Sequence, residues 1–250
     1  SLKGYTFTAA AWASGGNLNT GRYFITGTGP KTAAIVMAGS TGFPDQPTAT
    51  NATEEYNGST WSPGGNLNTS RTGAAGFGAS STSAVCATGI VSPNTALTAT
   101  EEYNGSSWTN SGSANTNVYA AFSTGIESAG LKGQGDQIPG VRRTNNVEEY
   151  NGSSWTNVNS TGATSYYGKA IGTQTAAIVI GGNALSPYTN KSTEEYDGTN
   201  WTNGPNTNQV STQGGSAGSA SDGLYYGGSD AGTLLAHTES WDGTSWSDTT

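Results

Sequence analysis

The chain has 250 residues, of which only 10% are charged, and its net charge is −8. A surface this acidic repels phosphate groups, so we expect no nucleic-acid partner. No apolar run is long enough to span a bilayer, so we expect no membrane insertion. A single cysteine, Cys86, allows no disulfide within the chain, so stability must come from packing.

A sequence motif of about eleven residues recurs along the chain. It has acidic residues before an aromatic residue, then Asn-Gly or Asp-Gly, then Trp. The tryptophans that follow the Asn-Gly or Asp-Gly turn, together with Trp12 of a degraded first copy, stand at positions 12, 61, 108, 155, 201 and 246, so successive intervals are 49, 47, 47, 46 and 45 residues. A nearly fixed period of this length indicates a supersecondary unit that buries its apolar faces only by stacking on copies of itself.

Four strand patterns follow one another within each period. The first is a run of small residues, such as residues 72–78, and the second is an apolar run ending in glycine, such as residues 33–39 and 176–182. Continuous apolar character indicates a strand that is covered on both faces. The third strand carries Glu-Glu-Tyr and the fourth begins at the Trp. Asn-Gly or Asp-Gly between them favours positive φ and predicts a tight hairpin in every unit.

Four antiparallel strands per unit and five full units predict an all-β fold, a five-bladed β-propeller, with residues 1–250 as one domain. Residues 5–18 carry an additional third and fourth strand pattern, because residues 5–7 precede Trp12 with the same offset that residues 54–56 have to Trp61. We expect this strand pair to share or extend the closing blade. A ring with a partial sixth blade is the alternative.

These features together resemble the kelch repeat. An apolar strand ends in Gly-Gly at 181–182 and 227–228, and a variable loop then leads to Glu-x-Tyr with Trp five residues after the Tyr. The Arg that precedes the next unit in that pattern is matched by Arg22 and Arg71, whereas later units have no basic residue there. The resemblance covers nearly the whole chain and implies a kelch-like propeller, similar in composition to kelch-like proteins of marine phages and bacteria. The third unit departs most, at residues 129–135, so we expect its blade to pack least well.

The adjacent glutamates of the repeat suggest chemistry at first sight. Neighbouring residues on a strand point to opposite faces, so the two members of a pair cannot converge on one ligand. The position two before the aromatic residue is Glu in all five full units, which indicates a structural role: we expect each to accept hydrogen bonds from the backbone or from Arg. The positions are 54, 101, 148, 194 and 239. We expect the tryptophans to pack between blades.

The chain lacks the catalytic residues and metal ligands that the possible enzyme classes need. Galactose oxidase shares the kelch architecture, but a copper site of that type needs two histidines and this chain has only His237. A single His, with Cys86 in an apolar strand, also does not support Ser-His-Asp or Cys-His catalysis. Residues 197–201 and 242–246 resemble the Asp-box of sialidases, but without an arginine triad. We therefore expect no enzymatic activity, no cofactor and no metal, with a propeller hydrolase or oxidase as the enzyme alternative.

The loops that connect the repeated strands differ in sequence and length from one unit to the next. If strands alternate in direction, the second-to-third and fourth-to-first connections emerge on one face, here called the front, while the repeated hairpins cover the back. A rigid ring with a variable front is typical of a recognition module. The front candidates are Phe43 and Tyr188 for stacking on a sugar or peptide, Arg142 and Arg143 for an acidic group, and Asp45, Asp136 and Asp230 for polar groups or calcium.

The sequence therefore predicts a non-catalytic binding module that presents variable loops to a glycan or protein on a cell surface. The expected setting is a phage appendage or a cell-surface domain, outside the cell or on a virion. The alternative is a structural assembly module that contacts neighbouring subunits of a virion or fibre.

Overall fold

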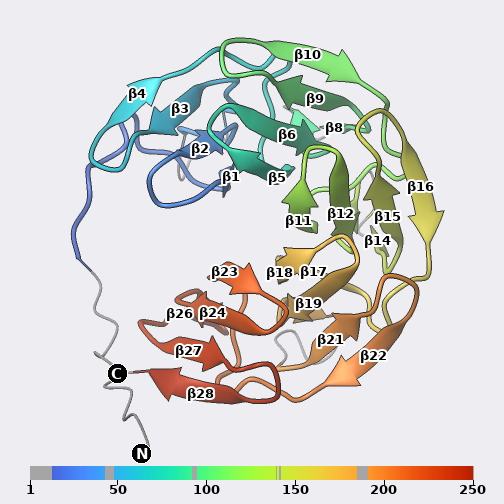
Figure 1. Cartoon of the computed structure of the whole chain (residues 1–250). Coiled ribbons are helices and arrows are strands. Elements are labelled where there is room, and N and C mark those ends of the chain that lie inside the picture. The colour runs from blue at the N-terminus through green and yellow to red at the C-terminus, as the bar shows by residue number, and fades with distance from the viewer. Residues whose placement is uncertain are drawn as a thin grey trace, which may run out of the picture.

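The computed structural model describes residues 13–42, 48–91, 95–138, 140, 142–184 and 191–249. Within these residues the fold is all-β, with five four-stranded antiparallel sheets. The sheets stand around a central axis as blades, with the first strand of each blade nearest the axis and the fourth at the rim (Figure 1). The five-bladed β-propeller predicted from the repeat is confirmed. None of the described residues belongs to a helix that could cross a membrane.

Each blade takes its four strands from one sequence repeat. Blade 1 comprises β1 (Thr26–Thr28), β2 (Ala34–Met37), β3 (Thr53–Tyr56) and β4 (Trp61–Pro63). Blade 2 comprises β5 (Ala75–Ser80), β6 (Ser83–Ala87), β9 (Thr100–Tyr103) and β10 (Trp108–Ser111). Blade 3 comprises β11 (Phe122–Ile126), β12 (Ala129–Gly133), β15 (Val147–Tyr150) and β16 (Trp155–Val158). Blade 4 comprises β18 (Lys169–Thr173), β19 (Ala176–Ile180), β21 (Thr193–Tyr196) and β22 (Trp201–Gly204). Blade 5 comprises β23 (Gly215–Ser219), β24 (Asp222–Tyr226), β27 (Thr238–Trp241) and β28 (Trp246–Thr249).

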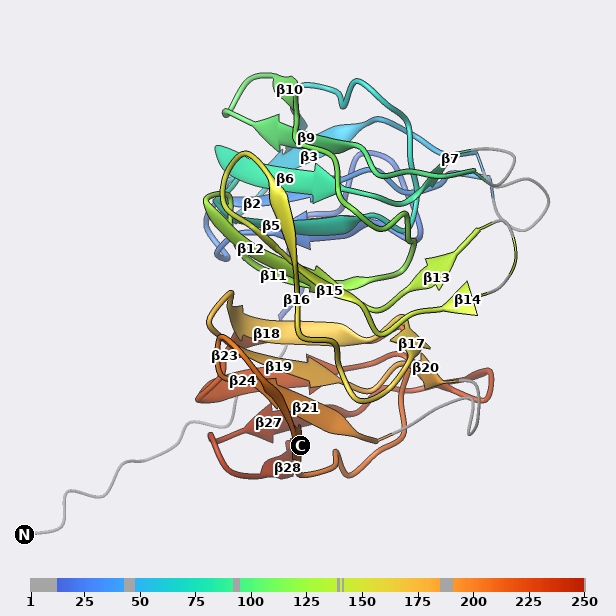
Figure 2. The ribbon, with the colours of Figure 1, turned by 90° about the vertical axis from the view of Figure 1, so that its right-hand side faces the viewer.

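Four small two-stranded sheets lie on the front face. They pair β7 (Ile90–Val91) with β8 (Thr95–Ala96), β13 (Asp136–Gln137) with β14 (Arg142–Arg143), β17 (Ser165–Tyr166) with β20 (Asn183–Ala184), and β25 (Ser229–Asp230) with β26 (Thr233–Leu234). In Figure 2 the labelled strands β7, β13, β14, β17 and β20 lie on the right, beyond the ends of the blades. The variable connections therefore share one face of the ring, as the alternation of strands predicts.

The repeated hairpin turn on the back is an Asx turn. In blade 3, Asn151 Oδ1 accepts hydrogen bonds from the backbone N–H of Ser153 at 3.0 Å and of Ser154 at 2.9 Å, while Gly152 has φ of 92°. A side chain with a β-carbon strains at that φ, so glycine is favoured there. In blade 5 Asp242 makes the same two bonds to Thr244 and Ser245, each at 2.8 Å. The Asn-Gly and Asp-Gly prediction is thus confirmed.

The Asp242 turn makes the fold sensitive to acid. Hydrogen bonds from the Thr244 hydroxyl and from the backbone of Ser245 and Thr244 lower the pKa of Asp242 from 3.8 to about 2. Because the folded value lies below the unfolded one, the stabilisation is complete above pH 3.8 and is lost as the pH falls toward 2. We expect Asp242→Asn, which restores the Asn of blades 1 to 3, to flatten this acid limb. The check is the melting temperature of the unchanged protein and of Asp242→Asn, measured at several values between pH 2 and 5. If Asp242 does not cause the acid sensitivity, the two melting temperatures will fall in parallel.

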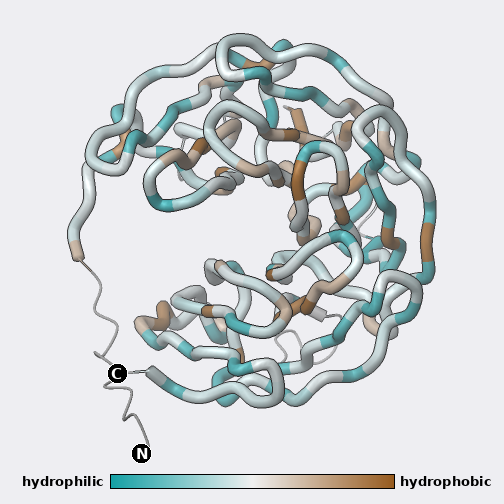
Figure 3. Tube along the Cα trace, in the orientation of Figure 1, coloured by the Kyte–Doolittle hydropathy of each residue, from teal (hydrophilic) through white to brown (hydrophobic). Residues whose placement is uncertain are grey.

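The apolar core is divided among the junctions between blades. At the junction of blades 1 and 2, Ile35 and Met37 from β2 pack with Ala84 and Cys86 from β6 and with Trp108. Clusters of the same kind join blades 2 to 3, 3 to 4 and 4 to 5, so hydrophobic stretches are short and spread around the ring (Figure 3). The prediction that tryptophans pack between blades is confirmed for these junctions. Burial also raises the pKa of the Cys86 thiol to about 12, which leaves it unreactive.

The first glutamate of each pair holds the linker that enters its blade. Glu101 accepts hydrogen bonds from the backbone N–H of Asn68 at 2.6 Å and of Thr69 at 3.2 Å, and pairs with the Arg71 guanidinium at 2.5 Å. Each counterpart in the other blades also accepts backbone N–H bonds from its linker, at Glu54, Glu148, Glu194 and Glu239. The predicted structural role is confirmed.

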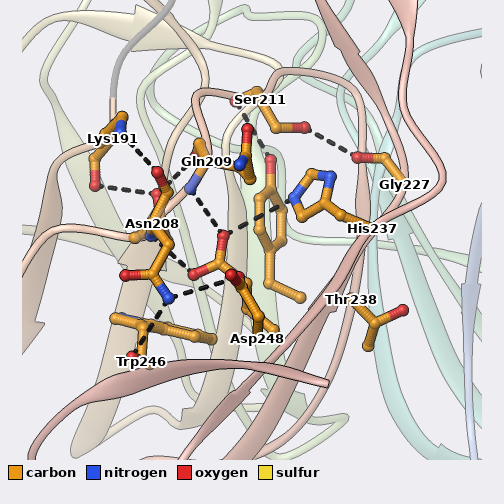
Figure 4. A network of polar contacts seen from close by, with 12 residues as sticks. Lys191, Asn208, Gln209, Ser211, Gly227, His237, Thr238, Trp246 and Asp248 are labelled. Carbon is orange, nitrogen blue, oxygen red and sulfur yellow. Dashed lines mark hydrogen bonds and ion pairs between the residues drawn. The ribbon is translucent and has the colours of Figure 1, made fainter. Parts of the chain in front are cut away.

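In blade 5 the chain's single histidine lies beside the corresponding glutamate. Glu239 accepts hydrogen bonds from Asn208 N at 2.7 Å and Gln209 N at 2.9 Å, and His237 Nε2 lies 3.7 Å from its carboxylate (Figure 4). The Asn208 side chain reaches the Trp246 carbonyl from the same linker. The chain's only histidine thus belongs to the packing of a linker against a blade.

The second glutamate of the pair reaches the neighbouring blade. Glu55 accepts a hydrogen bond from the Tyr103 hydroxyl of blade 2 at 2.5 Å, and Glu149 accepts one from Tyr196 of blade 4 at 2.9 Å. Glu102 is bonded in the same way by Tyr150. The two glutamates of a pair therefore face opposite ways, as the strand geometry predicts.

The departures of blade 3 from the repeat have partners in the structure, while the expectation that this blade packs least well stays a prediction. Lys132 on β12 is buried, and its amine lies 2.7 Å from Glu148 and 5.1 Å from the ring centre of Trp155. It supplies from the second strand the charge that an Arg supplies in blades 1 and 2. Gly130 leaves room for Phe77 of blade 2, because a β-carbon at 130 would lie 2.1 Å from that ring. The departures from the repeat are complementary to their neighbours.

The predicted strand pair at 5–18 is only partly within the described residues. Residues 13–18 form no strand, and residues 5–12 lie outside the described part of the chain. All five blades draw their strands from residues 26–249.

Candidate recognition site

A collar of backbone hydrogen bonds surrounds the axis at the front of the ring. The residue two positions before each first strand adopts positive φ, and these residues are Phe24 (50°), Gly73 (61°), Ala120 (55°), Tyr167 (60°) and Gln213 (62°). From Gly73 onward, the N–H of each member donates to the carbonyl of the preceding member, at 3.0, 2.8, 2.8 and 3.4 Å in turn. Bulky residues are strained in this region of φ, and such strain persists only where the surroundings impose it.

The collar carries aromatic side chains that meet across the ring. The aromatic cluster consists of Tyr23, Phe24, Tyr119, Tyr166 and Tyr167. Phe24 of blade 1 stacks on Tyr167 of blade 4, with ring centres 5.3 Å apart and planes at 20°. Blades 1 and 4 are not neighbours, so this contact spans the axis. The remaining contacts run from Tyr119 to both tyrosines at 6.1 and 6.2 Å, between Tyr166 and Tyr167 at 4.4 Å, and from Tyr23 to Phe24 at 5.1 Å.

A cavity of about 700 Å³ lies along the first strands of the blades. It begins directly after the collar, since its walls include Ile25, Ala74, Ala121 and Gly214, and small or hydroxyl-bearing residues make up most of the rest. Lys169 also lines it, and burial lowers the pKa of that amine. The front end of the ring therefore combines aromatic rings at the surface with a largely polar cavity behind them.

Beside the aromatic cluster, a hairpin brings together an acid and a base with unused bonding capacity. Asp136 and Arg143 face each other on β13 and β14, and the Arg143 guanidinium lies 4.6 Å from the ring centre of Tyr166. Asp136 is 3% exposed. Among the described residues, Asp136 Oδ1 and Arg143 Nε and Nη1 are buried without a hydrogen-bond partner. These atoms retain the capacity to bond to a ligand or to water that reaches the hairpin.

The electrostatics of this group reflect its burial. Burial raises the pKa of Asp136, and the charge of Arg143 and the hydroxyl of Tyr119 oppose that rise. Burial and the nearby Asp136 raise the pKa of Tyr119 to about 12, so this phenol remains a hydrogen-bond donor at neutral pH. The site thus offers phenol rings, one guanidinium and one carboxylate. That combination suits a ligand with both an apolar face and hydroxyl groups.

The predicted site residues divide into three groups. Asp136 and Arg143 lie together at the aromatic cluster. Arg142 is on the same hairpin but exposed, and Asp230 lies on the separate β25–β26 hairpin of blade 5. Phe43, Asp45 and Tyr188 lie outside the described residues.

Sequence reasoning missed the aromatic cluster itself. Its members occupy the same two positions before the first strand in three of the five units, as Tyr23-Phe24, Tyr119 and Tyr166-Tyr167. Aromatic residues recurring in a polar connection rather than in a strand are the signal that marks them.

Within the described residues no three of the His, Cys, Asp and Glu side chains gather where they could hold a metal ion. Comparison with models of known protein families and with curated proteins finds no match for this chain.

Proposed function

We propose that this propeller is a non-catalytic recognition module that binds a glycan at the aromatic cluster. The observation that carries the proposal is the cluster itself, with the unpartnered atoms of Asp136 and Arg143 beside it. Sugar rings stack on aromatic faces through their C–H groups, while their hydroxyls bond to charged side chains. The collar fixes the rings before a ligand arrives, so little ordering entropy is lost on binding.

We further propose that the repeat is of the kelch type and that the domain acts outside the cell, on a phage appendage or a cell surface. Support comes from the Gly-Gly ends of the apolar strands and from the Glu-x-Tyr and Trp positions, which recur in blade after blade. Variable hairpins at the front and uniform turns at the back fit a surface that diversifies to meet different glycans or surface proteins.

The test is binding to a glycan array, followed by titration of the best glycan. We expect Tyr166→Ala to weaken binding about tenfold or more, because it removes both a stacking surface and the ring beneath Arg143. Arg143→Met should do the same. Lys31→Ala, which removes one positive charge from a hairpin turn on the back, should bind like the unchanged protein. Equal loss in all three, or glycan binding untouched by the first two, would refute this site.

A structural assembly role is the second candidate, in which the propeller contacts neighbouring virion or fibre subunits. The observation that favours it is that one junction of the ring lacks the packing of the other four. Light scattering at rising protein concentration separates the two: assembly predicts oligomers, recognition predicts a concentration-independent mass. Stoichiometric copper or zinc in metal analysis would contradict the non-catalytic proposal itself.

A further inference from the structure

The cavity behind the collar, here called the central cavity, has one charged residue among the described residues that line it, Lys169. Lys169 is the first residue of β18 and follows Tyr167 of the collar by two positions. In Figure 1, β18 and the first strands of the other blades stand closest to the axis, so this charge lies near the middle of the ring and not at its rim. The glycan site proposed at the aromatic cluster assigns no role to this amine.

The Lys169 amine forms no ion pair and no hydrogen bond with any other described residue. Buried cations elsewhere in the ring are paired. Arg71 lies 2.5 Å from the Glu101 carboxylate, and Lys132 lies 2.7 Å from that of Glu148. Burial without such a partner lowers the pKa of the Lys169 amine, because the charged form has lost part of its hydration. An anion that entered the central cavity would supply the missing partner.

Two backbone carbonyls of the strand that carries Lys169 are already bonded to hydroxyl groups of the neighbouring blades. Thr124 Oγ1 of blade 3 donates to the Gly172 carbonyl at 2.6 Å, and Ser216 Oγ of blade 5 donates to the Ala170 carbonyl at 2.9 Å. All four residues line the central cavity. Because the two hydroxyl protons are engaged, the hydroxyl oxygens have only lone pairs to offer to a ligand. The wall beside Lys169 therefore offers one cation and several hydrogen-bond acceptors.

The charge and the hydrogen-bonding capacity of this wall indicate the class of ligand. A monocarboxylate balances the single amine of Lys169, whereas a doubly charged anion such as phosphate would leave an unpaired negative charge within a chain whose net charge is already −8. Lone pairs on the wall favour a ligand that donates hydrogen bonds, as hydroxyl groups do. A carboxylic acid that also carries hydroxyl groups meets both conditions.

We propose that the central cavity is a second binding site, separate from the aromatic cluster, and that it binds a hydroxylated monocarboxylate such as a sugar acid through the Lys169 amine. The carboxylate pairs with the ammonium group, and hydroxyl groups of the ligand donate to wall oxygens such as those of Thr124 and Ser216. The cavity volume of about 700 Å³ lies within the range of about 300–1,000 Å³ that is typical of small-molecule sites. The site therefore has room for a whole sugar acid.

The test compares glucuronate with glucose, because glucuronate carries a carboxylate where glucose carries a hydroxymethyl group. Isothermal titration at pH 7 should show that glucuronate binds the unchanged protein at least about tenfold more tightly than glucose does. Lys169→Met should abolish this preference. Lys31→Met, which removes an exposed positive charge on the back, should retain it. Equal binding of the two sugars to the unchanged protein, or binding of neither, would overturn the proposal.

Further measurements separate loss of charge from loss of folding and locate the anion. The melting temperature of Lys169→Met without ligand should not fall, because the substitution removes a cation that has no partner. Lys169→Arg should keep the preference for glucuronate, since it keeps the charge. A preference that is lost in Arg143→Met but kept in Lys169→Met would place the anion at the β13–β14 hairpin and overturn the proposal. Inorganic phosphate that binds as tightly as glucuronate would overturn the assignment to a monocarboxylate.

Discussion

Replacing Arg71 with methionine is expected to lower the free energy of unfolding by about 3–5 kcal/mol, the range found when one partner of a buried ion pair is removed. Arg71 is fully buried and donates to the carbonyls of Ala99 at 2.8 Å and Thr88 at 3.2 Å as well as to Glu101 at 2.5 Å. Methionine fills much of the volume but leaves the Glu101 carboxylate without a cation and removes the Arg71 donor from the Thr88 and Ala99 carbonyls, of which Ala99 keeps the Thr88 N–H at 3.0 Å. Urea denaturation at pH 7, followed by tryptophan fluorescence, measures the loss.

The control is a substitution that removes a positive charge from an exposed position without a buried ion-pair partner. Lys31 is exposed, and Lys31→Met should change the free energy of unfolding by about 0.5 kcal/mol or less. A loss below about 1 kcal/mol for Arg71→Met would mean that the backbone bonds of Asn68 and Thr69 suffice to hold Glu101. Blade 4 already relies on backbone bonds from its linker, since Glu194 accepts from Gly162 and Ala163.

The fold could be predicted from sequence because each signal is local and recurs. Asn-Gly fixes a turn through the φ of the glycine, and an apolar run without alternation indicates a strand covered on both faces. The role of the glutamates followed from strand geometry, which sends Glu54 and Glu55 to opposite sides. Five repetitions of the same argument leave few alternatives to a ring of blades.

The site could not be predicted in the same way, because its contacts join residues that no local rule relates. The stacking of Phe24 on Tyr167 requires knowing that blades 1 and 4 face each other across the axis. The role of Lys132 in blade 3 is a similar case. In the sequence it looks like a break in an apolar strand, and only the structure shows it paired with the Glu148 carboxylate in a blade that lacks the Arg. Asp136 and Arg143 were predicted because a front loop with charged residues is a general signal of binding, and the structure places them opposite each other on one hairpin.

The second large effect is expected at the junction of blades 2 and 3, where Trp155→Ala should lower the free energy of unfolding by about 3–5 kcal/mol. Trp155 is 7% exposed, and its indole N–H donates to Thr100 Oγ1 at 2.9 Å. Its ring meets Phe77 edge-on at 5.9 Å and lies 5.1 Å from the amine of Lys132. Removing the ring opens a cavity between two sheets and withdraws the aromatic face beside a buried charge.

Trp155→Phe separates these contributions. Phenylalanine keeps an aromatic ring between the blades but cannot donate to Thr100, so we expect a loss on the order of 1–2 kcal/mol. Urea denaturation measures both variants, and equal losses would assign the effect to the hydrogen bond rather than to packing. If packing dominates, unfolding of the alanine variant should also become less cooperative, because a propeller transmits stability from blade to blade only through such junctions.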